Sequence, residues 1–374
     1  MPHIVKVPRK ARGGRARYAW KVRYRDPERI ERARTFARKA EAERFAASVE
    51  TDIARGEYVN PRAGRVPLRE WATDWLQTTR HLKPKTREGY ASLLRQHIVP
   101  RLGSRSLSSV RPVDVRRFVS DLTDAGLSPS RIRQAHHLLG MLFSAAVENG
   151  MIARSPVIGV KVPHARRREM KFLTAEQVAA LAIEVPERYR ALIYLLAYGG
   201  LRWGEAAALR RSRCNLLRSR VEVIEAVSEV GGKLHYGAPK TYQHRSVAIP
   251  AFLRDMLAHH LGLFTAEDPD ALVFTSPEGA PLRSNNFRRR VWLPALAAAG
   301  LPSTVRIHDL RHTCASLLIS QGGHAKAIQQ HLGHSSISVT FDVYGHLLPD
   351  EQERIAAALN DVFRAATTNL ESKP

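Results

Sequence analysis

Two proline-containing linkers divide the chain, and they constrain its fold more than any other feature of the sequence. The first covers residues 61–67 and the second residues 155–171, and the stretches between them have their own apolar periodicities. A chain of 374 residues is also longer than one hydrophobic core usually serves. The sequence therefore predicts a mainly helical α+β chain with small antiparallel sheets and three domains, over residues 1–60, 66–153 and 172–374.

The first predicted domain combines a small sheet with one helix. Residues 18–24 alternate between aromatic or apolar and polar side chains, as a half-buried strand does. An Asp-Pro pair at residue 26 favours a turn, after which residues 32–36 can form a returning strand. Residues 39–53 have helical periodicity. Residues 1–16 are open to another interpretation, a disordered basic arm.

The second and third predicted domains are mostly helical. A compact bundle is expected from four segments punctuated by glycines: 68–79, 85–99, 112–125 and 129–149. The third domain begins with a capping box, Thr174-Ala-Glu-Gln177. A small antiparallel sheet is expected within it, from residues 221–227, 233–236 and 246–249. The rest, up to residue 366, is expected to be helical.

The chain is strongly basic, with 59 Lys and Arg against 35 Asp and Glu and a formal net charge of +24. A surplus of this size predicts a polyanionic partner, with nucleic acid as the first candidate and a merely solubilising charge as the alternative. The candidate DNA contacts are basic residues of the first sheet and of the second linker: Arg17, Lys21, Arg23, Arg25, Arg166, Arg167 and Arg168.

Several classes of protein are excluded. No apolar stretch approaches the roughly 20 residues of a membrane span, and nothing at the N-terminus marks the chain for secretion. Cys214 and Cys314 cannot form a disulfide framework and fit a reducing cytoplasm. No glycine-rich nucleotide loop occurs, so ATP use is not expected. His308 and His312 have the spacing of zinc ligands, but their surroundings are basic and the glutamate of a zinc protease is missing, so no metal or other cofactor is expected.

Five motifs stand in order in the C-terminal half. They are Gly200-Leu-Arg202-Trp-Gly-Glu205, Pro239-Lys240-Thr241, His308-Asp-Leu-Arg311-His312, Leu332-Gly-His334 and Tyr344. In order and spacing they resemble the motifs of the tyrosine recombinases, the phage integrase family, and the Arg-x-x-Glu and His-x-Leu-Arg-His boxes are the most specific. The resemblance implies an arm-type DNA-binding domain over residues 1–60, a helical core-binding domain over 66–153 and a catalytic domain over 172–374.

The resemblance also implies which residues perform the reaction. Arg202 and Arg311 hold the scissile phosphate, because guanidinium groups can meet the charge that gathers on its oxygens in the absence of metal. Tyr344 is the nucleophile. A free phenol has a pKa of about 10, and the surrounding cations are expected to favour its phenolate form.

The remaining residues of the motifs have supporting chemistry. By the same resemblance, His308 is a general base or phosphate ligand, and His334 donates a hydrogen bond to a nonbridging oxygen. Lys240 is the candidate general acid for the leaving 5′ oxygen. Glu205 and His312 are expected to support these groups, either directly or by orienting them.

The function implied is that of a site-specific recombinase, which cleaves and rejoins DNA through a 3′-phosphotyrosine intermediate to integrate or excise a mobile element. Its expected partners are double-stranded DNA with core and arm sites, three further copies of the chain in a tetramer, a host DNA-bending factor and a directionality factor. The expected location is the cytoplasm, on the nucleoid. Residues 350–366 either pack on their own domain or dock onto a neighbouring subunit. Two alternatives are a type IB topoisomerase and a non-catalytic DNA-binding regulator.

Overall fold

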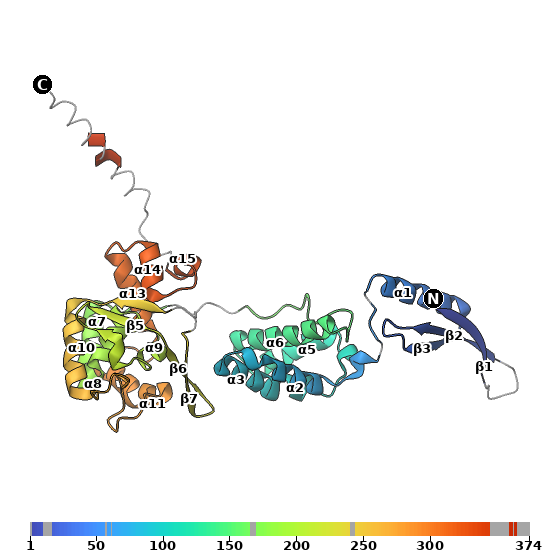
Figure 1. The fold of residues 1–374 in the computed structure, drawn as a ribbon, viewed down its shortest axis with the longest axis horizontal. Helices are drawn as coiled ribbons and strands as arrows, with labels where there is room; N and C mark the ends of the chain where they lie inside the picture. The colour runs from blue at the N-terminus through green and yellow to red at the C-terminus, as the bar shows by residue number, and fades with distance from the viewer. Residues whose placement is uncertain are drawn as a thin grey trace. The chain divides into compact units, whose positions relative to one another are not determined.

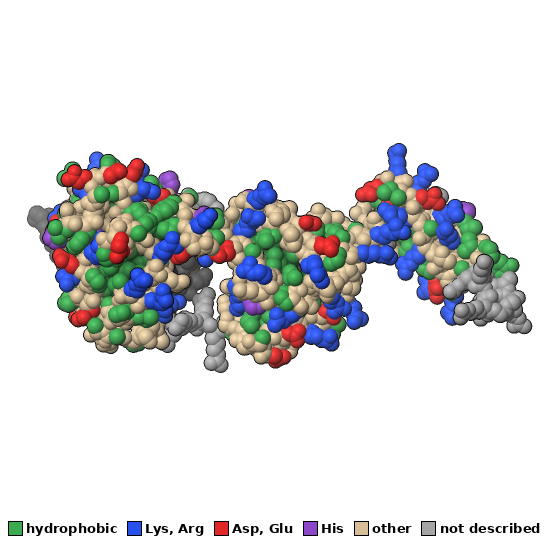
Figure 2. Space-filling view, turned by 90° about the horizontal axis from the view of Figure 1, so that it is seen from below, with side chains coloured by type: hydrophobic (Ala, Val, Ile, Leu, Met, Phe, Trp, Pro, Cys, Tyr) green, Lys and Arg blue, Asp and Glu red, His purple; other side chains and the backbone are tan. Residues whose placement is uncertain are grey.

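The computed structural model describes the chain in eight stretches, over residues 2–9, 17–56, 58–60, 62–164, 170–239, 244–344, 359–361 and 363–364. The chain forms two compact units, Met1–Arg167 and Arg168–Pro374. Both are mainly helical with small antiparallel sheets, as predicted (Figure 1). Lys and Arg side chains recur over the surface of both units (Figure 2).

The N-terminal unit begins with a three-stranded antiparallel sheet and a helix. These elements are β1 (His3–Arg9), β2 (Arg17–Arg25), β3 (Glu31–Phe36) and α1 (Lys39–Ala54). Val22 and Tyr24 of β2 form a small core with α1. Because side chains alternate along a strand, Lys21, Arg23 and Arg25 lie on the opposite face of the sheet.

Strand β1 corrects the interpretation of residues 1–16 as a disordered arm, at least for residues 3–9. Its register places Ile4 opposite Val22 and Lys6 opposite Trp20, so the hydrogen bonds and side chains of β2 order a segment whose own composition is basic. Ile4 packs against the small core that β2 forms with α1. Residues 10–16 lie outside the described part of the chain.

The rest of this unit is a helical bundle with its own core, in which Phe118 and Phe143 are among the largest fully buried side chains. Its helices are α2 (Leu68–Thr78), α3 (Pro84–Leu93), α4 (Val99–Leu102), α5 (Pro112–Asp124) and α6 (Pro129–Glu148). A π-helical turn (Leu94–Ile98) joins α3 to α4. Pro112 and Pro129 lie in first helical turns, as predicted, because proline lacks an N–H that would be unpaired there.

The C-terminal unit surrounds two small sheets with helices. The helices are α7 (Ala175–Glu184), α8 (Glu187–Tyr198), α9 (Trp203–Ala206), α10 (Ala251–Phe264), α11 (Ser284–Phe287), α12 (Leu293–Ala298), α13 (Asp309–Ser320), α14 (Ala325–Leu332) and α15 (Ile337–Tyr344). The strands are β4 (Cys214–Asn215), β5 (Arg220–Val223), β6 (Ala226–Val230), β7 (Lys233–Gly237) and β8 (Arg245–Ala248). The Thr174–Gln177 capping box is confirmed.

The prediction of one sheet in this unit was wrong. Strands β4, β5 and β8 form one antiparallel sheet, and β6 and β7 form a separate hairpin. The expected strand over 221–227 divides at Glu225, whose Oε1 accepts a hydrogen bond from Arg210 Nε at 2.6 Å. This ion pair lies at the break between β5, which ends at Val223, and β6, which begins at Ala226.

Two apolar clusters stabilise the C-terminal unit. The larger contains the fully buried Trp292, whose Nε1 donates to the Val305 carbonyl at 3.1 Å. The smaller contains Tyr344, and the entering residues Met170 and Phe172 pack against it. Figure 1 shows α13, α14 and α15, which carry most of the smaller cluster, side by side at one end of the unit.

Two further findings concern the predicted lack of a membrane span and the predicted C-terminal helix. Within its described part, no helix has the length and apolar character needed to cross a bilayer. After α15, the residues described are helical, and Leu359 and Phe363 are exposed. Most of the predicted helix over 350–366 lies outside the described residues.

Candidate active site

The site is built around a glycine turn between α8 and α9. Gly200 has a φ of +64°, a left-handed conformation that glycine adopts without steric cost. A Cβ atom at this position would lie 2.7 Å from Leu332 Cδ2 and 3.0 Å from Cys314 Sγ. Glycine therefore permits α13 and α14 to approach the turn, and Arg202 follows two residues later at the N-cap of α9.

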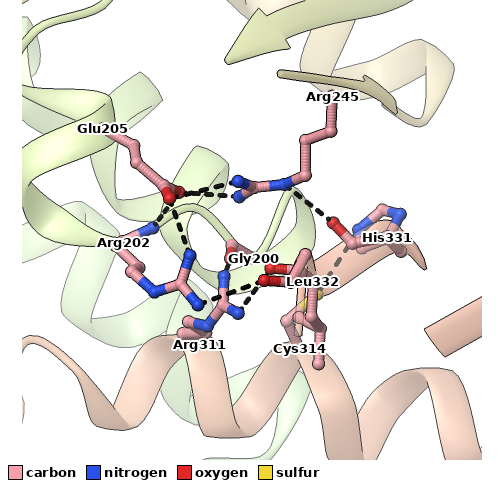
Figure 3. A network of polar contacts seen from close by, with 9 residues as sticks. Gly200, Arg202, Glu205, Arg245, Arg311, Cys314, His331 and Leu332 are labelled. Atoms are coloured by element: carbon pink, nitrogen blue, oxygen red, sulfur yellow. Dashed lines mark hydrogen bonds and ion pairs between the residues drawn. The ribbon is translucent and has the colours of Figure 1, made fainter. Parts of the chain in front are cut away.

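Arg311 lies in the first turn of α13 and is almost completely buried. Its Nη1 donates to the Gly200 carbonyl and its Nη2 to the Leu332 carbonyl, so it joins the glycine turn to the end of α14 (Figure 3). Burial, and then the charge of Arg202, lower the pKa of Arg311 to about 9. The guanidinium remains protonated at neutral pH and is a buried cation held by neutral carbonyls, an arrangement that favours an incoming anion.

A fully buried carboxylate, Glu205, lies between two arginines (Figure 3). Arg202 Nη1 donates to Glu205 Oε1 at 2.8 Å, and the Arg202 backbone N–H donates to Oε2 at 2.9 Å. From the other side, Arg245 Nη1 donates to Oε1 at 3.1 Å and Nη2 to Oε2 at 2.6 Å. Burial alone would raise the pKa of Glu205, but the bonds and charges of the two arginines lower it to about 2, so the carboxylate is ionised at any working pH.

Both arginines are also anchored to the end of α14. Arg202 Nη2 donates to the Gly333 carbonyl at 3.2 Å, and Arg245 Nε donates to the His331 carbonyl at 3.3 Å. The Arg202 side chain keeps 23% of its exposure, whereas that of Arg245 keeps 8%. Arg202 can therefore be reached by a ligand from solvent, and Arg245 lies behind it.

Tyr344 ends α15, and its ring is buried in the smaller apolar cluster. Its hydroxyl lies 2.7 Å from His312 Nδ1. The His334 ring stacks on the Tyr344 ring, with centroids 6.2 Å apart and an interplanar angle of 11°. His334 Nδ1 is 3.0 Å from Thr340 Oγ1, which fixes the orientation of that imidazole.

The structure pairs the Tyr344 hydroxyl with His312 rather than with His308. His308 lies one helical turn earlier and is exposed, and its ring contacts that of His312 with centroids 4.9 Å apart. The Arg306 backbone N–H donates to Asp309 Oδ2 at 2.7 Å, which fixes the turn that carries His308. The helix therefore presents both imidazoles on one side, with His312 nearer the tyrosine.

The pKa of Tyr344 differs from the sequence-based expectation. Burial raises the pKa of Tyr344 to about 12, and the opposing charges of Arg311 and Arg202 do not overcome it. The two arginines favour the phenolate, as expected, but their effect is outweighed because the hydroxyl is removed from water, so the phenol stays protonated at neutral pH.

The histidines are shifted in the opposite direction. Desolvation, followed by the charges of Arg311 and Arg202, lowers the pKa of His334 to about 4. Desolvation is also the first cause that lowers the pKa of His308 and of His312. These imidazoles are therefore neutral at pH 7, and a neutral imidazole can accept a proton.

The structure brings seven predicted site residues together and leaves the others outside this cluster. The cluster contains Arg202, Glu205, His308, Arg311, His312, His334 and Tyr344. Lys240, Arg166, Arg167 and Arg168 lie outside the described residues. In the N-terminal unit Lys21 is half-buried and Arg23 and Arg25 are exposed, while Arg17 begins β2 and its side chain is not described.

Arg245 is the member of the network that sequence reasoning missed. It begins β8, 40 residues after Glu205, and belongs to no recognised motif. One signal was present in the sequence. The negative charge of a glutamate among apolar residues needs cationic partners when it is buried, and Arg202 alone, three residues before Glu205, cannot pair with both carboxylate oxygens through its side chain. Nothing in the sequence indicated which of the many arginines supplies the second pair.

The described residues contain no group of three or more His, Cys, Asp or Glu arranged to hold a metal ion. Cys214 and Cys314 are both free thiols. Cys314 is buried beside His331, with its Sγ 3.7 Å from His331 Nε2. Burial raises the pKa of both thiols to about 12, so neither is a thiolate at neutral pH.

Comparison with known proteins gives consistent matches. Residues 171–351 match the phage integrase family, and residues 68–123 match its N-terminal SAM-like domain. An integrase of Mycobacterium phage L5 is 28% identical over 367 residues, which cover 95% of this chain and 97% of the relative.

Solved structures show the same fold. The integrase of transposon Tn1549, in complex with transposon right end DNA, has a TM-score of 0.70 at 20% identity, over 79% of this chain and 99% of that one. A lambda integrase tetramer bound to a Holliday junction has a TM-score of 0.55 at 20% identity, over 85% and 94% of the two chains. The chain belongs to the phage integrase family and is an enzyme of the tyrosine site-specific recombinase class.

Proposed function

We propose that this chain is the integrase of a mobile element, which cuts and rejoins DNA through a 3′-phosphotyrosine bond on Tyr344. The observation that carries the proposal is the meeting of the Tyr344 hydroxyl with His312 beside the guanidinium groups of Arg202 and Arg311. An acceptor for the phenolic proton and two cations for the phosphate are what metal-free attack on a phosphodiester requires.

The arginines bind the scissile phosphate in this proposal. A guanidinium has five N–H groups. Among the described residues, Glu205 and Gly333 accept from two side-chain N–H groups of Arg202, and Gly200 and Leu332 accept from two of Arg311. The N–H groups that remain can donate to phosphate oxygens, and a positioned arginine contributes roughly 10³–10⁵ in the rate of phosphoryl transfer.

Proton transfers accompany the attack. His312 accepts the Tyr344 proton through its Nδ1, with His308 against its ring as a second base or as a phosphate ligand. His334, stacked on the tyrosine, donates to a nonbridging oxygen. Lys240 protonates the leaving 5′ oxygen and lies outside the described residues. The phosphotyrosine retains the energy of the broken bond, so a 5′ hydroxyl from another strand can displace it without ATP.

The remaining parts of the chain supply DNA binding and assembly. Residues 172–374 act as the catalytic domain, residues 66–153 bind the core site and residues 1–60 bind an arm site, through Lys21, Arg23 and Arg25 with Arg17. The basic linker residues Arg166, Arg167 and Arg168 follow the phosphates. Two duplexes contain four strands, so four copies act together, as the lambda integrase tetramer on a Holliday junction also suggests. A DNA-bending factor and a directionality factor assist, in the cytoplasm.

Tyr344→Phe tests the nucleophile. This variant should form no covalent adduct with a nicked target duplex in denaturing electrophoresis and should still bind the DNA, because only the attacking oxygen is lost. Tyr194→Phe is the matched control, since it removes a hydroxyl from a half-buried tyrosine of α8. An adduct that persists in Tyr344→Phe assigns the attack to another residue and contradicts the proposal.

A further inference from the structure

We propose that Arg245 is a positioning residue of this active site: it holds Glu205 in place and thereby aims Arg202 at the scissile phosphate. The inference rests on the proposed function, in which Arg202 binds that phosphate.

The hydrogen bonds of Glu205 give the first argument. Each of its carboxylate oxygens accepts one hydrogen bond from the Arg245 guanidinium and one from Arg202. The Arg202 side chain donates to Oε1, and the Arg202 backbone N–H donates to Oε2. A two-point contact between a guanidinium and a carboxylate fixes the plane of both groups. Arg245 therefore sets the orientation of the carboxylate to which the Arg202 side chain is bound.

The exposure of the three side chains gives the second argument. Glu205 has no exposed side-chain surface and Arg245 keeps 8%, whereas Arg202 keeps 23%. A phosphate that approaches from solvent thus meets Arg202, while Arg245 contacts Glu205 from within the protein. Arg245 acts on the phosphate through another residue and not by touching it.

The end of α14 gives the third argument. Arg245 donates to the His331 carbonyl and Arg202 donates to the Gly333 carbonyl. Both arginines are therefore hydrogen-bonded to the C-terminal end of α14, which directly precedes His334. Gly333 has a φ of +67°, and a Cβ atom there would lie 2.8 Å from Arg245 Cδ. Glycine at this position leaves the space that the Arg245 side chain occupies.

Arg245 also keeps Glu205 ionised. Burial raises the pKa of this carboxyl, and the hydrogen bond from Arg245 is the strongest of the effects that oppose it. Without Arg245 the pKa of Glu205 should rise, and a protonated Glu205 would hold Arg202 more weakly. Loss of Arg245 should therefore make catalysis sensitive to acid in a range where the native enzyme is not.

Arg245→Met and Arg245→Lys test the inference in the full chain. The measurements are the single-turnover rate of adduct formation on a nicked duplex and the affinity for the same duplex. We expect Arg245→Met to cleave about 10²-fold more slowly, which is the scale of a small misplacement of a catalytic group, with unchanged DNA affinity. Arg245→Lys should recover part of the rate, because it restores the charge without the two-point contact.

The matched control is Arg213→Met. Arg213 Nη1 also donates to a glutamate of the same sheet region, Glu222 Oε2 at 3.3 Å, but this pair is 40% and 44% exposed and lies outside the Glu205 network. It should cleave at the native rate.

Two readouts distinguish positioning from a purely structural role. The rate of Arg245→Met should begin to fall at a higher pH than the native rate, which falls only as His312 becomes protonated. In an Arg202→Lys background, Arg245→Met should cause little further loss, because both changes affect one interaction. If Arg245→Met does not fold, Arg245→Gln, which is polar but uncharged, provides the same pH profile and double-mutant comparison.

Native cleavage by Arg245→Met, or a loss that is equal in both backgrounds, would overturn the inference. Failure of the native chain to form any adduct would instead overturn the proposed function.

Discussion

The environments of His308 and His312 separate two imidazoles that sequence motifs place only four residues apart. His312 Nδ1 is 2.7 Å from the Tyr344 hydroxyl, and His308 contacts the His312 ring while remaining exposed. Desolvation lowers the pKa of His312, which keeps it a neutral acceptor. Since Tyr344 has a raised pKa, its deprotonation depends on an acceptor at this distance.

His312→Phe should reduce the single-turnover cleavage rate by about 10²–10⁴, the range typical of general-base catalysis, while DNA affinity is retained. The pKa of His312 lies below 6.5. The native rate should therefore be independent of pH above this pKa and should fall as pH decreases through it, because protonated His312 cannot accept the proton of Tyr344. The variant should lack this limb. His259→Phe, at an exposed histidine of α10, is the control. An unchanged acid limb in His312→Phe would show that another group accepts the proton.

The glycine turn between α8 and α9 is the element on which the site depends. Gly200 meets two constraints together, a left-handed φ and contact with both α13 and α14. Its carbonyl also accepts from Arg311, so displacement of the turn moves the guanidinium. Backbone geometry and side-chain chemistry are therefore coupled at this position.

Gly200→Ala should lower the free energy of unfolding by about 1–2 kcal/mol from the left-handed backbone and by a further 1–3 kcal/mol or so from overpacking against Leu332 and Cys314. Gly279→Ala separates the two effects, because Gly279 has a φ of +79° and, among the residues that the structure describes, no atom lies within 4 Å of a Cβ there. It should show the backbone cost alone. Chemical denaturation followed by circular dichroism measures both, and equal losses would refute the steric argument.

Elements and residues governed by local rules could be predicted from the sequence. The helix expected over 129–149 is α6 (Pro129–Glu148), because its proline, apolar period and terminal glycine act within a few residues. Strand β1 could not be predicted, since its order comes from pairing with β2. Arg245 was missed for the same reason: its contact with Glu205 is a property of the folded chain and leaves no local pattern.

At the scale of the whole molecule, charge is distributed over both units and not confined to the site (Figure 2). On the N-terminal sheet, the face opposite α1 carries Lys21, Arg23 and Arg25, with Glu31 as the acidic neighbour of Arg23 at 3.8 Å. Such a long, half-exposed ion pair contributes little, so most of this positive charge is available to an anionic partner.

Replacing both Arg23 and Arg25 by Gln should flatten the salt dependence of binding to arm-site DNA. Each lost phosphate contact reduces the slope of log K against log salt by about 0.9. Binding to a core site should keep its slope. The control changes Arg38 and Arg55 to Gln, since both flank α1 and are exposed. Identical slopes for the double variant and the native chain on arm-site DNA would remove this face from the DNA contacts.

The segment that enters the C-terminal unit shares its small apolar cluster with the nucleophile. Met170 and Phe172 pack against the residues around Tyr344, and the Leu173 N–H donates to Thr313 Oγ1 on α13 at 3.0 Å. The entering segment therefore contacts the cluster around Tyr344 before it reaches the larger core, whose first residue is Leu173. A pulling force applied to the chain before residue 170 should act on the packing of Tyr344 before it acts on the larger core.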